Sequence, residues 1–298
     1  MHTRLVLSLA LTAALVGGAL TVPAAYARLA GGEHAPRPRA DVAATAGIDV
    51  DFDGELLSWA VLDHDTGELA GSANLTETSS TESMIKVWFA ADYLRAVGDR
   101  SPSDTMIANA ETAIRDSDDD AANALYAAAG GAASIDRLID KCKLTETAKN
   151  TTGPYAGWWS FTRMSARDAA RMGECIADGT AAGPTWTDWI LDQMSSVRGD
   201  LADQQERRGG GRWGIIDGLP AEVVADGRVG IKNGWTPLYA DETWRVNCLA
   251  VTDEWSMAVL LRYPLDAGLE YGARTCAAVA EQVVGDPGAG ATEILAAR

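Results

Sequence analysis

The stretch that decides the fold runs from Ser83 to Val97 and reads SMIKVWFAADYLRAV. Its run of apolar residues predicts a largely buried helix. Ser83 and Lys86 stand three positions apart at the start of this helix, so they share a face and the lysine amine can reach the serine hydroxyl. A serine at a helix N-terminus suits a nucleophile, because its backbone N–H and the positive helix end favour a developing oxyanion. Alone, the spacing also fits a helix N-terminal serine beside a surface lysine.

Two further motifs follow in chain order. Ser117-Asp118-Asp119 comes just before a predicted helix, and Lys232-Asn233-Gly234 stands at the end of a predicted strand. The chain has only five lysines, and Lys86 and Lys232 are two of them. Lysine can act as a base only where burial or a neighbouring cation lowers its pKa, so a catalytic Lys86 requires such surroundings.

Strand patterns flank these motifs on both sides. Upstream, 56–63 and 68–72 surround the turn 64–67, which predicts a β-hairpin. Downstream, predicted antiparallel strands and a closing helix cover 229–232, 244–251, 255–261 and about 267–284. Between these two regions, predicted helices cover 104–114, 119–129, 134–142, 166–177 and 185–197. We therefore predict an α/β (α+β) fold: one antiparallel sheet built from both chain ends, an inserted helical subdomain, and an active site in the cleft between them.

The two ends of the chain differ in composition from this predicted domain. Residues 1–27 contain an uncharged apolar run, Leu5 to Leu20, and end in Ala25-Tyr26-Ala27, which predicts a cleaved signal peptide. We interpret 28–47 as a flexible leader, 48–285 as the folded domain and 286–298 as a C-terminal tail. No cysteine stands at the cleavage point to receive a lipid, so we expect a secreted protein in the cell-wall space.

The composition excludes some classes of partner. Asp and Glu number 42 against 25 Lys and Arg, for a formal net charge of −17 among 298 residues. This charge repels phosphate backbones, so we expect no nucleic-acid partner. We also expect no stable membrane insertion after signal cleavage, and a monomer.

The four cysteines are Cys142, Cys175, Cys248 and Cys276, and four cysteines allow three pairings. Export favours disulfides, although free buried thiols would fit the same pattern. Their spacing is wrong for a CxxC metal or redox site, and no histidine lies near them. The Asp116–Asp120 cluster lacks the glycine and final glutamate of a calcium loop. We therefore expect no metal and no cofactor.

The ordered set of three motifs resembles the penicillin-recognising serine hydrolases, most closely their class A β-lactamase-like branch, with its S-x-x-K, S-D-N and K-[ST]-G elements. The resemblance covers about residues 50–284 and implies that family's fold. It implies that Ser83 attacks a carbonyl while Lys86 accepts the proton, and that Ser117 protonates the leaving nitrogen. Lys232 would hold the Ser117 hydroxyl and attract a substrate carboxylate, with the backbone N–H groups of Ser83 and Trp235 as the oxyanion hole.

Three departures from the family pattern concern substrate and water. Asp119 stands where the family usually has Asn, and Asn233 stands where it has Thr or Ser, while Gly234 is kept. An Asn donates to a substrate carbonyl, whereas a carboxylate only accepts, so we expect the substrate preference to differ from that of the family. Glu146 begins the sequence E-x-x-x-N, which in the family contains the glutamate that activates water, so Glu146 is a candidate deacylation base. Aligning the chain with the family pattern, however, places that glutamate's position nearer 152–155, where the sequence has no carboxylate.

These observations predict an exported serine hydrolase that forms an acyl-enzyme at Ser83 from a small anionic substrate, either a β-lactam or a D-alanyl cell-wall peptide. Slow deacylation is expected if no carboxylate activates water. The alternatives are a D,D-peptidase and a noncatalytic binding module on the same fold. The fold implied by the resemblance also pairs Cys142 with Cys175 and Cys248 with Cys276. Trp158 and Trp159, with Trp235, could line the cleft or lie in the core.

Overall fold

The computed structural model describes residues 48–205, 211–226 and 228–284. The signal peptide and leader predicted over 1–47 and the tail predicted over 286–298 lie outside the described residues. Within these residues, no helix combines the length and the apolar character that crossing a membrane requires.

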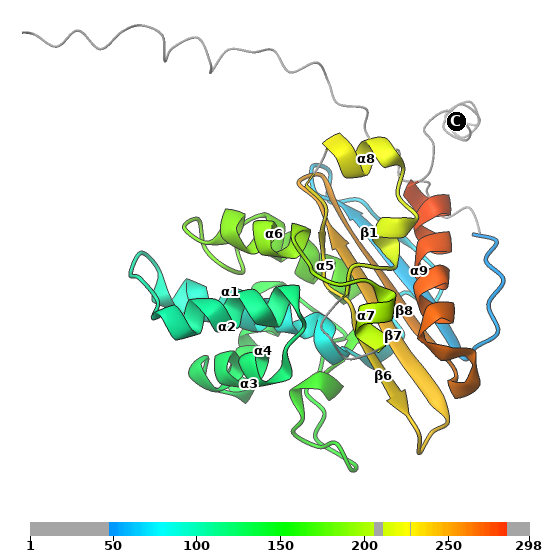
Figure 1. Cartoon of the computed structure of the whole chain (residues 1–298), viewed down its shortest axis with the longest axis horizontal. Helices are drawn as coiled ribbons and strands as arrows, with labels where there is room; N and C mark the ends of the chain where they lie inside the picture. The colour runs from blue at the N-terminus through cyan, green and yellow to red at the C-terminus, as the bar shows by residue number, and fades with distance from the viewer. Residues whose placement is uncertain (1–47, 206–210, 227, 285–298) are drawn as a thin grey trace, which may run out of the picture. The chain divides into compact units, whose positions relative to one another are not determined.

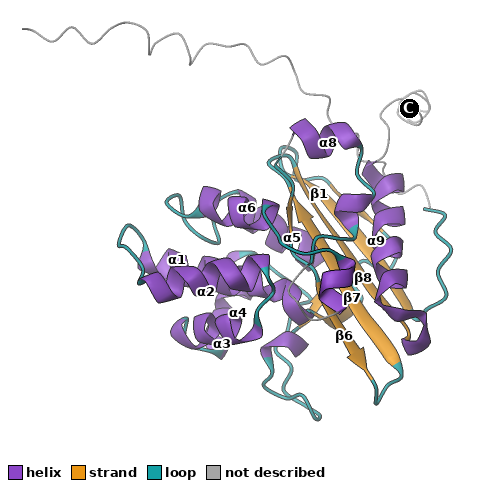
Figure 2. Ribbon diagram, viewed as in Figure 1, coloured by secondary structure: helices purple, strands orange, loops and turns teal. Residues whose placement is uncertain are grey.

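A six-stranded antiparallel sheet forms the centre of the fold (Figures 1 and 2). Its strands are β1 (Leu56–Asp63), β2 (Leu69–Gly71), β5 (Gly230–Ile231), β6 (Gly234–Leu238), β7 (Thr243–Val251) and β8 (Trp255–Pro264). They lie in the order β2-β1-β8-β7, and both β5 and β6 pair with β7. Because β1 pairs with β8 along its whole length, segments from the two ends of the domain are joined in one sheet, as the sequence predicted.

Helices cover both faces of this sheet. The helical elements are η2 (Glu82–Ile85), α1 (Lys86–Val97), α2 (Asp104–Arg115), α3 (Asp119–Ala128), α4 (Ala132–Lys141), η3 (Trp159–Phe161), α5 (Ala166–Ala177), α6 (Thr187–Ser195), α7 (Leu201–Gln205), η4 (Ile215–Asp217), α8 (Ala221–Asp226), η5 (Leu265–Ala267) and α9 (Gly268–Val284). Helix α5 packs on β1 and β8 from one side, and α9 packs on β7 and β8 from the other (Figure 1). Helices α1–α4 and α6 gather on the α5 side (Figure 1).

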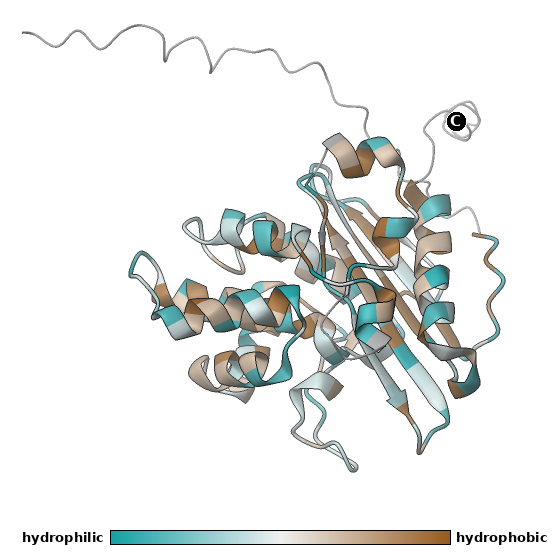
Figure 3. Cartoon of the chain, in the orientation of Figure 1, coloured by the Kyte–Doolittle hydropathy of each residue, from teal (hydrophilic) through white to brown (hydrophobic). Residues whose placement is uncertain are grey.

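Burial on both faces explains why β8 is apolar along most of its length, which Figure 3 shows as brown strand. Met257 and Val259 belong to the apolar cluster under α9, whereas Ala258 and Leu260 belong to the cluster under the helical subdomain. Successive residues of a strand point to opposite faces, so the strand needs apolar residues at every position. The first cluster therefore holds α9 against the sheet, and the second holds the helical subdomain against the opposite face.

Most predicted elements are confirmed, and the exceptions have local causes. The helix expected from Ser83 begins with the 3₁₀ turn η2 before α1 starts at Lys86. The strand β6 was missed because its sequence, GWTPL, contains glycine and proline, which are uncommon in strand interiors. Pro237 is tolerated there because β6 has a partner on only one side. Also missed were α7, α8 and the two-stranded sheet of β3 (Thr78–Ser80) with β4 (Arg163–Ser165).

Both expected disulfides are present. Cys142–Cys175 joins the end of α4 to α5, and Cys248–Cys276 joins β7 to α9. The first therefore ties together two elements of the helical subdomain, and the second fixes the closing helix to the sheet.

Candidate active site

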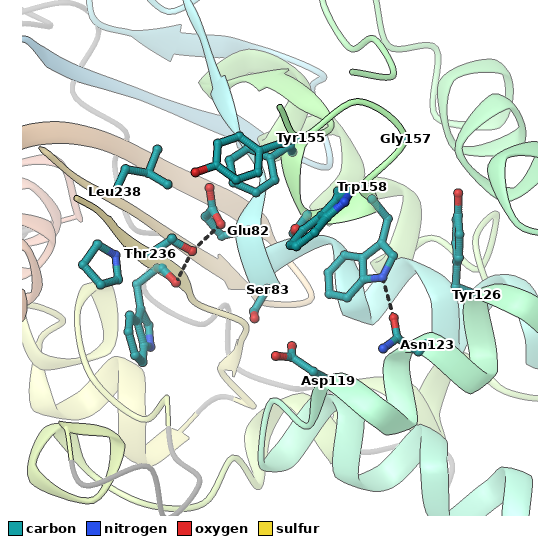
Figure 4. Close-up of a pocket in the computed structure, with 15 residues that line it drawn as sticks. Glu82, Ser83, Asp119, Asn123, Tyr126, Tyr155, Gly157, Trp158, Thr236 and Leu238 are labelled. Atoms are coloured by element: carbon teal, nitrogen blue, oxygen red, sulfur yellow. Dashed lines mark hydrogen bonds between the residues drawn. The ribbon is translucent and has the colours of Figure 1, made fainter. Parts of the chain in front are cut away.

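Ser83 lies in η2 and lines a pocket between the sheet edge and the helical subdomain (Figure 4). The edge strand β6 comes close to this turn at Gly234. A Cβ atom at Gly234 would lie 2.7 Å from the backbone nitrogen of Ser83 and 2.6 Å from that of Met84. Only glycine lets the strand approach the serine this closely, which is the physical reason for a glycine at this position of the third motif.

Lys86 begins α1 and is fully buried beneath the pocket. Its Nζ donates to the backbone carbonyl of Ser117, lies 3.4 Å from the Ser117 Oγ and pairs with Asp119 Oδ1 at 2.6 Å. Burial lowers the pKa of the Lys86 amine, while the neighbouring Asp119 carboxylate opposes that shift. The lysine thus has the buried setting that a neutral amine base requires.

Ser117 joins the two lysines. Lys232 Nζ donates to Ser117 Oγ at 2.9 Å and to the carbonyl of its neighbour Asn233 at 3.0 Å. Burial lowers the pKa of Lys232 well below its usual range, and the positive charge of Lys86 adds to that effect. Ser117 itself adopts a left-handed backbone conformation, with φ of 58°. Two amines therefore converge on one hydroxyl, an arrangement suited to passing a proton.

Asp119 is directed at the site by the start of α3. The side chain of Asp118, the N-cap, accepts a hydrogen bond from the Ala121 N–H at 2.7 Å and so fixes where the helix begins. Asp119 is the next residue, and its side chain is 77% exposed and lines the pocket. Figure 4 shows the Ser83 hydroxyl pointing toward this carboxylate. The structure thus brings Ser83, Lys86 and Asp119 together as the sequence motifs suggested.

Asn233 does not point into the pocket. Its Nδ2 donates to the carbonyls of Gly211 and Trp213, at 2.6 and 2.7 Å, and the residue is buried. The amide therefore anchors a neighbouring loop and does not line the pocket. The next residue but one, Trp235, does line it, in strand β6.

Glu146 is held away from the pocket. Its carboxylate pairs with Arg167 and accepts hydrogen bonds from Thr145 Oγ1 at 2.7 Å and Ser165 Oγ at 3.1 Å. Burial disfavours the ionised form, but the bonds from Arg167, Thr145 and Ser165 outweigh it and lower the pKa of Glu146 to about 2. Glu146 is also absent from the pocket lining. It links the start of the loop that follows α4 to the start of α5.

The pocket has a volume of about 660 Å³ and is rich in aromatic side chains. Its lining consists of Glu82, Ser83, Asp119, Asn123, Tyr126, Tyr155, Gly157, Trp158, Trp159, Ser160, Phe161, Trp235, Thr236, Pro237 and Leu238. Tyr155 stacks on Phe161 with ring centroids 4.0 Å apart, and Trp158 meets both rings edge-on. Trp158, Trp159 and Trp235, for which the sequence left open a place in the cleft wall or in the core, all belong to this lining.

Glu82, directly before Ser83, is a pocket residue that the sequence reasoning missed. It is buried, with a left-handed φ of 49°. Its carboxyl accepts hydrogen bonds from Ser80 Oγ and Thr236 Oγ1, each at 2.5 Å. Burial raises the pKa of Glu82, although the two hydrogen bonds act to lower it. Nothing in the local sequence distinguishes this glutamate from a surface one, because only the strained turn and strand β6 bury it.

Elsewhere in the described ranges, no group of three or more His, Cys, Asp or Glu side chains is arranged to hold a metal ion. The site offers the hydroxyls of Ser83 and Ser117, two amines, two carboxyls and backbone N–H groups.

Comparison with known proteins finds similarity to β-lactamases. A family model described as "Beta-lactamase enzyme family" matches residues 100–201. A curated relative, "Putative lipoprotein LppW" of Mycobacterium tuberculosis, is 33% identical over 189 residues, which cover 61% of this chain and 54% of the relative. The same name and figures hold for a relative from Mycobacterium bovis. The chain thus spans about half the length of the curated relatives it matches.

Solved structures show the same fold. An ancestral class A β-lactamase variant, of the last common ancestor of Gram-negative bacteria, aligns with a TM-score of 0.57 and 22% identity, covering 78% of this chain and 92% of that one. A β-lactamase from Xanthomonas campestris pv. campestris aligns with a TM-score of 0.59 and 18% identity, with the same coverages. The chain therefore has the class A β-lactamase-like fold that its three motifs suggested.

Proposed function

We propose that this protein is an extracytoplasmic serine hydrolase that forms an acyl-enzyme at Ser83 from a β-lactam or a D-alanyl cell-wall peptide. The observation that carries the proposal is the position of Lys86: its buried amine lies one helical turn from Ser83 and within reach of Ser117. A fold match alone would not carry it, because one fold hosts many functions.

The proposed reaction begins with proton transfer from Ser83 to Lys86. The Ser83 oxygen attacks the carbonyl, and its proton passes to the neutral Lys86 amine. The oxyanion accepts hydrogen bonds from the backbone N–H groups of Ser83 and Trp235. As the C–N bond breaks, Ser117 gives its proton to the leaving nitrogen, and Lys86 returns a proton to Ser117. The product is an ester at Ser83. From a D-alanyl peptide the amine leaves with the departing fragment, whereas the amine of an opened β-lactam stays attached to the acyl group, because the broken C–N bond lies in a ring.

Lys232, which lies between strands β5 and β6, completes this cluster. It holds the Ser117 hydroxyl at 2.9 Å and would attract a carboxylate on the leaving side of the substrate. This supports the proposal of a small molecule with a carboxylate at that end, although the surface as a whole is acidic. Gly234 keeps the strand close enough for Trp235 to serve as the second oxyanion donor.

We propose that the acyl-enzyme is long-lived. Hydrolysis of the ester needs a base to activate water, and the loop between α4 and α5 brings no carboxylate to the pocket. Loss of a general base costs roughly 10²–10⁴ in rate, which is enough to make deacylation limiting. A β-lactam should then give a burst of acylation followed by slow turnover.

The test is incubation of the mature protein with a fluorescent penicillin, followed by intact mass at several times and peptide mapping. We expect a stoichiometric adduct on Ser83 that Ser83→Ala abolishes. Ser79→Ala, a matched serine variant in the nearby strand β3, should label like the parent protein. An adduct that maps to Ser79 or Ser80, or no adduct at any time, would overturn the proposal.

Export is part of the proposal. The two disulfides fit an oxidising compartment, and the mycobacterial relative carries the name of a lipoprotein. We propose release from the membrane for this chain, because no cysteine stands near the predicted cleavage point. Detection of the protein with an attached lipid in the membrane fraction would contradict the proposed release but would still agree with export.

A further inference from the structure

The walls of the pocket carry negative charge and aromatic rings. Of the residues that line it, Asp119 and Glu82 are acidic, and none is a lysine or arginine. The two amines of the site, Lys86 and Lys232, lie below the pocket with 0% and 2% of their surface exposed. A substrate arm that enters the pocket beyond Ser83 therefore meets carboxyl groups and ring faces before it meets any amine.

Asp119 has an acceptor that the protein leaves unused. Its Oδ1 pairs with Lys86, but among the described residues no hydrogen bond or ion pair reaches Oδ2. A carboxylate oxygen accepts hydrogen bonds and donates none, so it cannot hold the carbonyl oxygen of a substrate. It can hold an N–H group, and an ammonium group best, because the bond is then charge-assisted.

The aromatic walls favour the same chemistry. Trp158, Trp159 and Trp235 line the pocket along with Asp119. The face of an aromatic ring attracts cations within about 6 Å of its centroid. Lys86 Nζ already lies 5.7 Å from the Trp159 centroid, so an amine group lies over this ring in the free protein. Trp158 is 60% exposed and offers a further ring at the pocket.

We propose that the pocket selects acyl donors whose acyl arm carries an ammonium group, and that Asp119 is the specificity-determining residue. This inference rests on the proposed acylation of Ser83 and names the substrate class. The preferred substrate is zwitterionic: its carboxylate lies on the Lys232 side, and its ammonium group lies between Asp119 Oδ2 and the tryptophan rings. Glu82 is a second carboxyl in the lining, but Ser80 and Thr236 already donate to it.

The test uses three penicillins that differ only at the α-carbon of the acyl arm. Ampicillin has an ammonium group there, benzylpenicillin has hydrogen, and carbenicillin has a carboxylate. The rate of adduct formation at Ser83 is measured by intact mass at pH 6, where an α-amino group is largely protonated. We expect ampicillin to acylate roughly 3–10 times faster than benzylpenicillin, as for a partly exposed charge contact, and carbenicillin to be slowest.

Variants of two adjacent aspartates separate the local contact from the general charge of the surface. Asp119→Asn should bring ampicillin and benzylpenicillin within about twofold of each other, since the amide removes the ion pair. Asp120→Asn removes the same charge from an exposed neighbour outside the lining and should keep the order of the three penicillins. Raising the pH to 9 should also remove the ampicillin advantage, because its amine loses the proton.

The outcomes distinguish the inference from the function on which it rests. If no penicillin forms an adduct at Ser83, the proposed acylation is wrong. If all three form adducts but benzylpenicillin or carbenicillin reacts as fast as ampicillin, the acylation stands and the ammonium preference is wrong. An ampicillin advantage that survives in Asp119→Asn would remove Asp119 as its determinant.

Discussion

Two regions border the same pocket and differ in chemistry. The junction of η2, α3 and β6 places polar groups at short distances, with Lys86 Nζ 2.6 Å from Asp119 and Lys232 Nζ 2.9 Å from Ser117. The loop between α4 and α5 contributes aromatic side chains, including Trp158, and its carboxylate Glu146 pairs with Arg167 instead of facing the pocket.

This difference separates the two halves of an acyl-transfer reaction. The groups that we propose form an ester lie in the junction, where Lys86 and Lys232 are buried and Ser83 lines the pocket. The resemblance to class A β-lactamases leads us to expect the water-activating glutamate from the loop, whose lining residues provide rings and no acid. A protein can keep the first half and lack the second, because different elements of the fold supply them. Five experiments test this comparison.

The largest effect is expected in the junction itself. Lys86→Met keeps a long, apolar side chain in the buried position but removes the proton acceptor, so the acylation rate should fall by roughly 10²–10⁴. The measurement is the rate of adduct formation at Ser83 by intact mass. Lys141→Met, at the end of α4, is the control and should react as the parent does. An unchanged rate in Lys86→Met would show that another group takes the proton.

The two disulfides can be removed separately, to compare the helical subdomain, which carries the aromatic loop, with the face of the sheet that packs against α9. The pairs Cys142→Ala/Cys175→Ala and Cys248→Ala/Cys276→Ala open loops of similar length, with separations of 33 and 28 residues. Each should lower the free energy of unfolding by ~3.5 kcal/mol on the chain-entropy model, measured by urea denaturation. Only the first borders the aromatic loop, so only it should alter the acylation rate. Equal changes of the acylation rate in the two disulfide variants would contradict this difference between the two regions.

The charge of Asp119 should set the pH dependence of acylation. Its carboxylate favours the ammonium form of Lys86, so its removal lowers the pKa of that amine and leaves more neutral base at a given pH. The acid limb of the acylation rate against pH should move to lower pH in Asp119→Asn. Asp120→Asn serves as the control. A limb that stays in place would mean that the pair does not persist in solution.

The smallest kinetic effect is expected in the loop. Because Glu146 does not reach the pocket, Glu146→Gln should change the lifetime of the adduct by less than about twofold, which nitrocefin turnover and intact mass measure. A large loss of turnover would instead make Glu146 the deacylation base.

The same variant should change stability with a defined sign. The folded pKa of Glu146 is about 2, below the value of about 4.3 for an unfolded glutamate. Its ion pair with Arg167 therefore contributes stability above about pH 4.3, and that contribution is lost as the pH falls toward 2. The difference in unfolding free energy between parent and Glu146→Gln should shrink over that range. A constant difference would mean that the pair adds nothing.

Local sequence was enough to predict the helix over 166–177 and the strands that meet at the two chain ends, because apolar periodicity reports which residues must be buried. It also predicted the three motifs as one site, since their order matches a known fold. It could not place Asn233, whose amide turns toward the carbonyls of Gly211 and Trp213. Those carbonyls come from a loop about 20 residues away, and no spacing in the sequence records that contact.

The sequence by itself determined the fold class, the order of Ser83, Lys86, Ser117 and Lys232, and the lack of a carboxylate over 147–164. These follow from residue type and periodicity, which act locally along the chain. Only the tertiary structure decided that Glu146 faces Arg167 and that Glu82 is buried beside the nucleophile. Charge positions depend on which distant groups supply hydrogen bonds and exclude water, so they are settled when the sheet and the helical subdomain pack together.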